Sequence, residues 1–186
     1  MNIFQGKLIR LRAVEATDWE NHIQWDQDSE LARLSYEIPF PRSTMGYREW
    51  AEREAQRPPE NDVYRFQMET LDGNVEVGTI NTNRCDLRSG TFGYGLAISA
   101  PYQRKGYGSE AIRLVLRYYF LERRYQKCSV EVYSFNEPSQ RLHEHLGFTL
   151  EGRLRRMVYT NGQFYDSLWY GITREEFEAQ VNLAAV

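Results

Sequence analysis

Cysteine is scarce in this 186-residue sequence: Cys85 and Cys128 are the only two, and they stand far apart. Two separated cysteines supply neither a disulfide framework nor a zinc site, so we expect no bound metal. Long apolar runs are also missing, and residues 1–4 lack the basic-then-apolar layout of a secretory signal. These absences predict a cytoplasmic protein with no membrane partner.

A surplus of positive charge is missing as well. The chain has 23 Lys and Arg residues against 26 Asp and Glu residues, which gives a formal net charge of −3. Proteins that bind nucleic acid through its phosphates need a basic surface, so we expect no nucleic-acid partner. The hydrophobic content of 41% is enough for a buried core, and we expect a single domain over residues 1–186.

Alternating apolar residues predict strands, and apolar residues at helical spacing predict helices, in a mixed order along the chain. Turn signals at Asp72-Gly73-Asn74 and Asn161-Gly162 predict two hairpins, the first of which continues into a three-stranded meander. Helix starts are predicted at the capping residues Thr17-Asp18, Ser43-Thr44, Asn136 and Thr173. The expected strands cover residues 7–12, 63–70, 75–81, 91–98, 128–133, 150–160 and 163–172, and the longest expected helix covers residues 110–123.

A glycine loop follows the meander directly, with the sequence Pro101-Tyr102-Gln103-Arg104-Lys105-Gly106-Tyr107-Gly108-Ser109. Its two glycines let the backbone turn N–H groups inward, and the helix that follows adds unpaired donors and the positive end of its dipole. Arg104 and Lys105 stand beside these donors and can meet further phosphate charge. The loop therefore predicts a pyrophosphate site and a phosphorylated cofactor.

The same glycines also fit the dinucleotide fingerprint G-x-G-x-x-A, as Gly106-Tyr107-Gly108-Ser109-Glu110-Ala111. That fingerprint needs a tight turn directly after a parallel strand and an acidic residue at the end of the next strand. Here a proline-containing loop separates strand and glycines, and Glu131 lies within its strand. A nicotinamide-binding oxidoreductase is therefore an alternative that this context disfavours.

Two motifs in order resemble the GNAT superfamily of N-acetyltransferases. The first, Gln103-Arg104-Lys105-Gly106-Tyr107-Gly108, is similar to the acetyl-coenzyme A loop Q/R-x-x-G-x-G/A of that superfamily. The second combines Asn136-Glu137-Pro138-Ser139 with Leu146-Gly147-Phe148. The opening Leu8-Ile9-Arg10-Leu11-Arg12 and the hairpin at Asn161-Gly162 further resemble the branch that acetylates ribosomal-protein N-termini and its polyamine-acetylating relatives.

The resemblance implies an α/β (α+β) fold with a mixed, mostly antiparallel sheet of about seven strands, splayed around the cofactor and flanked by helices on both faces. It implies transfer of an acetyl group from acetyl-coenzyme A to a primary amine, by direct attack in a ternary complex. The acceptor would be a protein N-terminus, a polyamine or another small amine, and a homodimer is expected by family analogy.

The resemblance also assigns residues to the cofactor. Backbone N–H groups of the glycine loop would hold the pyrophosphate, Gln103 would position the loop, and Asn136 would contact the pantetheine arm or act only as a helix cap. A backbone N–H near the end of the third meander strand would stabilise the oxyanion. The expected cofactor-binding residues are Leu96, Ala97, Ile98, Gln103, Arg104, Lys105, Gly106, Tyr107, Gly108, Ser109, Asn136 and Ser139.

Acetyl transfer needs a group that takes a proton from the acceptor. An alkyl ammonium with a pKa near 10 gives up its proton at pH 7 at a cost of about 4 kcal/mol. Glu131 stands where some relatives place a general base, although it could equally be a solvated strand residue. Several relatives carry a glutamate at the position of Thr91, and its absence leaves Glu131, Glu76 or a water relay as candidates.

A second proton is needed by the departing thiolate. Many family members place a tyrosine where this sequence has His143, whose imidazole could donate that proton or could simply be a packing residue. Ser139 offers a hydroxyl for the same role, or only satisfies a helix end. Glu131, Ser139 and His143 are therefore the predicted catalytic residues.

Acidic residues are frequent in the N-terminal helices, where they would attract a cationic acceptor or simply be solvated. They are Glu15, Asp18, Glu20, Asp26, Asp28, Glu30 and Glu37. The departures at Thr91 and His143 leave a second alternative function, a non-catalytic sensor of acyl-coenzyme A.

Overall fold

A computed structural model describes residues 2–35 and 38–184, and the side chains up to residue 180. Over these residues seven strands form a mixed sheet in the order β1-β2-β3-β4-β5-β7-β6, and six α-helices flank it. The sheet is open, and the predicted α/β class is confirmed. The chain divides into two compact units: Met1–Thr82 with Gly95–Leu114, and Asn83–Tyr94 with Val115–Val186.

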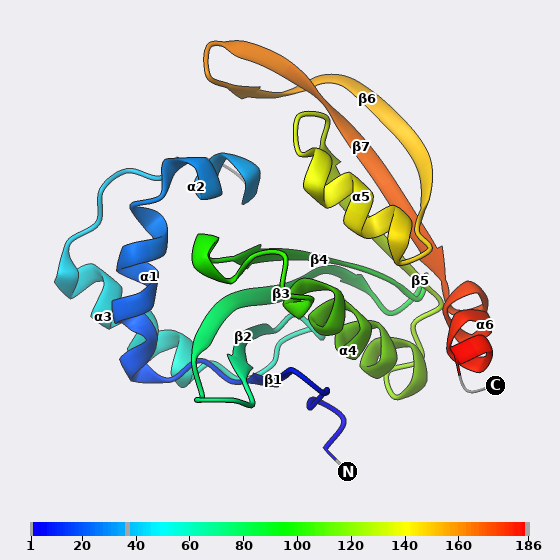
Figure 1. Ribbon diagram of the computed structural model, residues 1–186, viewed down its shortest axis with the longest axis horizontal. Coiled ribbons are helices and arrows are strands. Elements are labelled where there is room, and N and C mark those ends of the chain that lie inside the picture. The colour runs from blue at the N-terminus through cyan, green and yellow to red at the C-terminus, as the bar shows by residue number, and fades with distance from the viewer. Residues whose placement is uncertain (1, 36–37, 185–186) are drawn as a thin grey trace. The chain divides into compact units, whose positions relative to one another are not determined.

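The first unit contains β1 (Ile9–Arg12), β2 (Arg65–Thr70) and the first part of β3 (Glu76–Asp86). Both strand pairs are antiparallel, and β1 lies at the edge of the sheet. Figure 1 shows the helices α1 (Trp19–Asp26), α2 (Ser29–Ser35) and α3 (Thr44–Ala55) in the long connection from β1 to β2. The apolar core of the unit includes Ile9, Leu11, Met68, Val77 and Ile80, all at most 5% exposed.

Local signals account for most of these elements. Ser43 caps α3 as predicted, because its hydroxyl accepts the N–H of Gly46 at 3.1 Å. The predicted cap at Thr17-Asp18 is wrong in its chemistry: Asp18 precedes α1, but its carboxylate makes no cap bond to that helix. It binds Arg12 instead, with both N–O distances at 2.9 Å. The short helix α2 was not predicted, because no residue of α2 is buried and its apolar periodicity is weak.

The second unit is built on β5 (Lys127–Tyr133), which pairs in parallel with β4 (Thr91–Ile98) through Thr91 and Phe92. On its other edge β5 pairs antiparallel with β7 (Gln163–Thr173), and β7 forms a long hairpin with β6 (Thr149–Thr160), as Figure 1 shows. Aromatic rings fill the core: Phe92 stacks on Tyr119 with ring centroids 4.5 Å apart. The predicted hairpin at Asn161-Gly162 is confirmed.

Three helices complete the fold. The helix α4 (Tyr107–Leu121) begins in the first unit within the glycine loop, three residues before the expected start at residue 110, and continues into the second unit. In the second unit, α5 (Glu137–His145) starts at the predicted cap Asn136, whose side-chain oxygen accepts the N–H of Ser139 at 3.2 Å. The last helix, α6 (Arg174–Ala184), begins with reciprocal bonds between Thr173 and Glu176. In the part of the chain described here, no helix has the length and apolar character needed to cross a bilayer.

Gly78 marks a close approach between β3 and β4. A Cβ atom at this position would lie 2.2 Å from the carbonyl oxygen of Ala97, so the two backbones have no room for a side chain. Gly78→Ala should lower the free energy of unfolding by roughly 1–3 kcal/mol, the usual cost of overpacking, as measured by urea denaturation. Gly152→Ala is the matched control, because no atom lies within 4 Å of its added Cβ. Equal free energies of unfolding for Gly78→Ala and Gly152→Ala would contradict the close contact between β3 and β4 at Gly78.

Candidate active site

The glycine loop follows β4, and two hydrogen bonds connect its first part and the residue before it to β3 and β4. The N–H of Ser99 donates to the carbonyl of Val77 at 3.0 Å, and the Gln103 side-chain amide donates to the carbonyl of Ile98 at 3.0 Å. Arg104 and Gly106 have positive φ angles of 61° and 86°, after which α4 begins at Tyr107. A left-handed residue beside a helix start is a backbone arrangement in which successive N–H groups can form an anion-binding concavity. The bond from Gln103 connects the loop to the end of β4.

The loop carries positive charge on exposed side chains. Arg104 and Lys105 are both exposed, and the Lys105 ammonium lies 5.3 Å from the centre of the Tyr102 ring. The acidic residue of the first turn of α4, Glu110, is not free to oppose an anion, because its carboxylate accepts N–H groups of the N-terminal segment. Upstream, Leu96, Ala97 and Ile98 end β4, in the same unit as the loop. The predicted cofactor residues of this unit therefore lie on one continuous segment.

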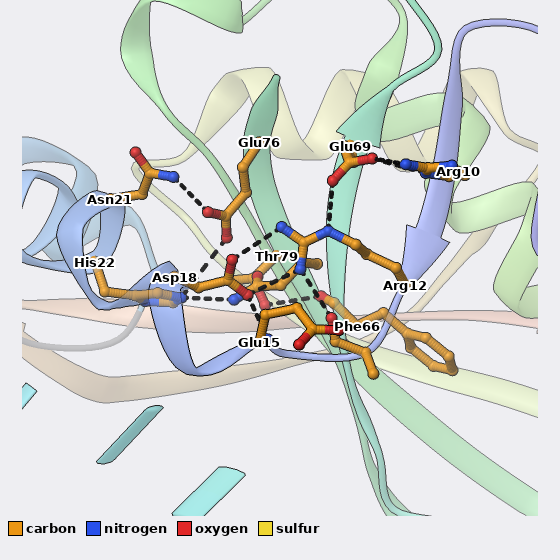
Figure 2. Close-up of polar contacts among 12 residues, drawn as sticks. Arg10, Arg12, Glu15, Asp18, Asn21, His22, Phe66, Glu69, Glu76 and Thr79 are labelled. Carbon is orange, nitrogen blue, oxygen red and sulfur yellow. Dashed lines mark hydrogen bonds and ion pairs between the residues drawn. The ribbon is translucent and has the colours of Figure 1, made fainter. Parts of the chain in front are cut away.

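A buried polar cluster occupies the same unit, between α1 and the β2–β3 hairpin (Figure 2). Glu76, the first residue of β3, is 8% exposed, and its Oε2 accepts the Asn21 side-chain N–H at 2.5 Å. Its other oxygen, Oε1, is buried without a hydrogen-bond partner, 3.9 Å from Nε2 of His22. His22 in turn lies 2.7 Å from the side-chain amide of the fully buried Gln67. The cluster thus brings an acid and an imidazole together away from water.

Burial shifts both groups of this cluster toward their neutral forms. Desolvation raises the pKa of Glu76 from 4.5 to about 7, while the Asn21 hydrogen bond opposes the shift. Desolvation also lowers the pKa of His22 from 6.5 to about 4. At pH 7 the imidazole is therefore neutral and Glu76 is close to half ionised. A carboxyl group that titrates near neutral pH is suited to proton transfer.

Arg12 binds two buried carboxylates beside the cluster. Its guanidinium binds both oxygens of Asp18 and donates from Nε to Glu69 at 2.6 Å, and Glu69 also binds Arg10. Asp18 and Glu69 are 5% and 7% exposed, and buried carboxylates of this kind need such pairing. These ion pairs tie β1 and β2 to the start of α1. The acidic residue Asp18 is therefore a structural partner here.

The other acidic residues of the N-terminal helices are mostly bound locally. Asp26 accepts the Tyr47 hydroxyl at 2.8 Å, Asp28 accepts two N–H groups at the start of α2, and Glu30 pairs with Arg33. Glu37 lies outside the described residues. These local contacts favour the interpretation that the acidic residues are ordinary helix-surface residues. They give less support to the interpretation that the residues attract a cationic acceptor.

Glu131, the predicted base, lies in the second unit on an exposed face of β5. Its Oε1 accepts the hydroxyl of the fully buried Ser167 at 2.6 Å, and it stands opposite Trp169 in the β5–β7 register. The Glu131 side chain is thus exposed, in contrast to the buried Glu76.

Ser139 and His143 lie one turn apart on α5 in the same unit. The Nδ1 atom of His143 is 2.7 Å from the Ser139 carbonyl and 3.4 Å from its hydroxyl. Because a carbonyl only accepts, we assign the proton to Nδ1, which leaves Nε2 as an acceptor. His143 is 2% exposed, Nε2 has no hydrogen-bond partner, and burial lowers the pKa of the ring. This tautomer favours Ser139 over His143 as a proton donor.

The packing of His143 explains its burial. Its ring stacks on those of Tyr94 and Tyr170, with centroids 5.9 and 6.1 Å away, and meets the edge of Phe148. The hydroxyl of Tyr94 is buried without a hydrogen-bond partner, like Nε2 of His143. The packing interpretation of His143 is therefore well supported by its surroundings.

Comparison with known proteins connects these features to a family. Residues 9–149 match a family model described as an acetyltransferase (GNAT) domain, and this range includes the glycine loop and the second motif at residues 136–148. The chain belongs to the GNAT acetyltransferase family. A prophage-derived N-acetyltransferase of Bacillus subtilis, YokL, is 46% identical over 93% of this chain and 94% of its own length. The chain is accordingly an acetyl-transferring enzyme.

More distant relatives extend the comparison. The spermidine N(1)-acetyltransferase of Escherichia coli is 25% identical over 92% of this chain and 89% of its own length. A crystal structure of spermidine N-acetyltransferase from Vibrio cholerae, in complex with CoA and spermine, superposes with a TM-score of 0.79. It is 20% identical and covers 91% of this chain and 98% of its own, so it supports the GNAT fold alone. Among the described residues no group of three His, Cys, Asp or Glu side chains could hold a metal ion.

The pH dependence of stability should reveal the buried carboxyl group. Between pH 4.5 and 7 the folded chain holds more protons at Glu76 than the unfolded chain, so its contribution to the free energy of unfolding falls as the pH rises. The His22 contribution rises between pH 4 and 6.5, because there the unfolded chain holds more protons. Glu76→Gln should therefore gain on the order of 2 kcal/mol relative to wild type between pH 5 and pH 8.

Urea denaturation at both pH values measures this difference. Glu20→Gln, which removes an exposed carboxylate of the same unit, controls for the change in net charge. A wild-type-to-variant difference that stays constant across this pH range would contradict the raised pKa of Glu76.

Proposed function

We propose that this chain transfers an acetyl group from acetyl-CoA to the primary amine of a small molecule or a peptide N-terminus. The observation that carries the proposal is the open glycine loop at the head of α4, inside the segment that matches the GNAT domain. Acetyl-CoA supplies the activated thioester. The residues of the chain bind and orient acetyl-CoA. They also take a proton from the amine and supply one to the departing thiolate.

The glycine loop would hold the diphosphate of the cofactor. N–H groups at the start of α4 act as donors with the favourable end of the helix dipole, and Arg104 and Lys105 add charge. Gln103 keeps the loop against the end of β4 through its bond to Ile98. Leu96, Ala97 and Ile98 would offer backbone groups to the pantetheine arm, and Asn136 and Ser139 are further candidates for that arm in the second unit.

Glu76 is the stronger candidate for proton acceptor in the first unit. It combines a buried position, an oxygen with no hydrogen-bond partner and a pKa of about 7. It also belongs to the same unit as the glycine loop and the end of β4. Glu131 is the alternative that the family resemblance favours, and its exposed carboxylate is accessible to an amine or to a relay water. Ser139 is the favoured donor to the thiolate, because His143 presents an acceptor at Nε2.

The acceptors named for two relatives suggest the acceptor class of this chain. One relative over most of the chain is a spermidine N(1)-acetyltransferase, while another, AaaT of Escherichia coli, is an L-amino acid N-acetyltransferase at 24% identity. Both acceptors present a primary amine that must lose a proton before it attacks. The proposal is therefore a primary amine as the acceptor class, with spermidine and free amino acids as the first compounds to assay.

Calorimetric titration followed by a turnover assay tests the function. The chain should bind CoA and show no affinity for NADH, and a panel of amines that includes spermidine, amino acids and N-terminal peptides should yield free thiol from acetyl-CoA. Binding of CoA without turnover on any amine would favour a sensor instead. Binding of NADH alone would contradict the proposal.

Substitution of the two carboxylates separates their roles. Glu76→Gln should lower kcat/KM roughly 100-fold at pH 7, the usual contribution of a general base, and should remove the rise of rate with pH near 7. CoA affinity should stay unchanged. Glu131→Gln, measured in parallel over pH 6–9, serves as the comparison. A loss confined to Glu131→Gln would transfer the role of base to that residue.

A further inference from the structure

The N-terminal segment forms a tight turn that binds a carboxylate. Residues 4–11 fold back on themselves, with the Leu11 N–H bonded to the Phe4 carbonyl at 2.8 Å and the Gly6 N–H bonded to the Ile9 carbonyl at 2.9 Å. At the tip of this turn, the N–H groups of Lys7, Leu8 and Ile9 all donate to the carboxylate of Glu110, at 2.7, 2.8 and 2.8 Å. We call residues 6–9 the carboxylate-binding turn.

Glu110 lies in the first turn of α4, and its own N–H donates to the Gly106 carbonyl at 3.1 Å. A second contact links the same segments: the Leu8 side chain lies 3.3 Å from the position that a Cβ on Gly106 would occupy. The carboxylate-binding turn therefore contacts Gly106, which precedes α4, and Glu110, which lies in the first turn of α4.

The fit around this carboxylate is close. A Cβ on Gly6 would lie 2.2 Å from the carboxyl carbon of Glu110, so the turn has room for the carboxylate only because residue 6 is glycine. Three charge-assisted bonds to backbone N–H groups are strong and directional, and they fix the side chain in one position. Since Glu110 is part of the helix, the position and tilt of the first turn of α4 are fixed with it.

This arrangement also resolves a conflict of charge. An acidic side chain near the start of a helix interacts well with the helix dipole, but it competes with an anion for the same donors. By binding the Glu110 carboxylate at residues 7–9, the turn supplies it with other donors. The N–H groups at the head of α4 are then left for a ligand, and the loop keeps its cationic side chains on its exposed side.

We propose that Glu110, seated in the carboxylate-binding turn, is a positioning residue that holds the glycine loop in its diphosphate-binding conformation. The inference rests on the proposed function and adds to it that the N-terminal segment is part of the scaffold of the cofactor site. Loss of the carboxylate from the turn should therefore weaken the binding of CoA and leave the handling of the amine unchanged.

Calorimetric titration of CoA into the full chain tests the proposal. Glu110→Gln places an amide N–H₂ against backbone donors, so it should raise the Kd for CoA roughly ten-fold. The KM for acetyl-CoA should rise in parallel, while kcat at saturating acetyl-CoA and the KM for the amine should stay at wild-type values. As a control, Glu175→Gln changes an exposed acidic residue in the first turn of a different helix, α6, and should leave the Kd unchanged.

Gly6→Ala tests the same contact from the other side without a change of charge. The added methyl group displaces the carboxylate, so this variant should also raise the Kd for CoA. In a Glu110→Ala background the methyl group has room, and Gly6→Ala should then have little further effect on the Kd. Additive effects of the two substitutions would overturn the pairing of Gly6 with Glu110.

Thermal unfolding of each variant distinguishes positioning from general stability. Wild-type CoA affinity in Glu110→Gln and Gly6→Ala, together with a lowered Tm, would show that the turn only stabilises the fold, and would overturn the proposal. Tighter CoA binding by Glu110→Gln would show that its charge only repels the cofactor, with the same consequence. Failure of the wild-type chain itself to bind CoA would instead refute the proposed function.

Discussion

Backbone N–H groups that lie outside regular secondary structure must find acceptors, and the first unit is organised around how this requirement is met. At the carboxylate-binding turn the acceptor is built in, since the Glu110 carboxylate takes three N–H groups at once. At the glycine loop the chain adopts left-handed angles at Arg104 and Gly106, which direct donors outward at the head of α4. One set of donors binds an internal anion, and the other is the set that we propose for an external one.

The second feature of this unit is the buried carboxyl group of Glu76, which lacks a cationic partner within hydrogen-bond distance among the described residues. Arg12 pairs with Asp18 and Glu69, so those carboxylates tolerate burial as ions. Glu76 has only the Asn21 amide as a hydrogen-bond donor, and its environment favours the neutral acid. The neutral His22 beside it cannot compensate with positive charge. The same unit thus contains carboxylates that pair with arginine and one buried carboxyl group whose pKa desolvation raises to about 7.

Much of the fold could be predicted from local sequence, because the signals act over a few residues. The turns at Asp72-Gly73-Asn74 and Asn161-Gly162 fixed two hairpins, and the cap at Asn136 fixed the start of α5. Helix α2 was not predicted, because a helix with no buried residue needs no apolar face that the sequence could reveal. The environment of Glu76 also could not be read locally, because Asn21, His22 and Gln67 come from two other elements. A glutamate that opens a strand carries no sign in the sequence that it will be buried.

The site was predicted in part for the same reason. The glycine loop is contiguous, so its residues were found together, whereas the partners of Glu110 are about a hundred positions away in the chain. The motif around Ser139 and His143 was found by family resemblance, but the tautomer of His143 depends on the α5 carbonyl that its ring contacts.

The central claim is that main-chain amides at residues 103–109 bind the diphosphate of CoA. Hydrogen–deuterium exchange of the wild-type chain with and without saturating CoA tests it directly. The account predicts that exchange slows at the amides of residues 103–109 when CoA is bound. Saturating CoA that leaves exchange in this segment unchanged, while other segments become protected, would contradict it.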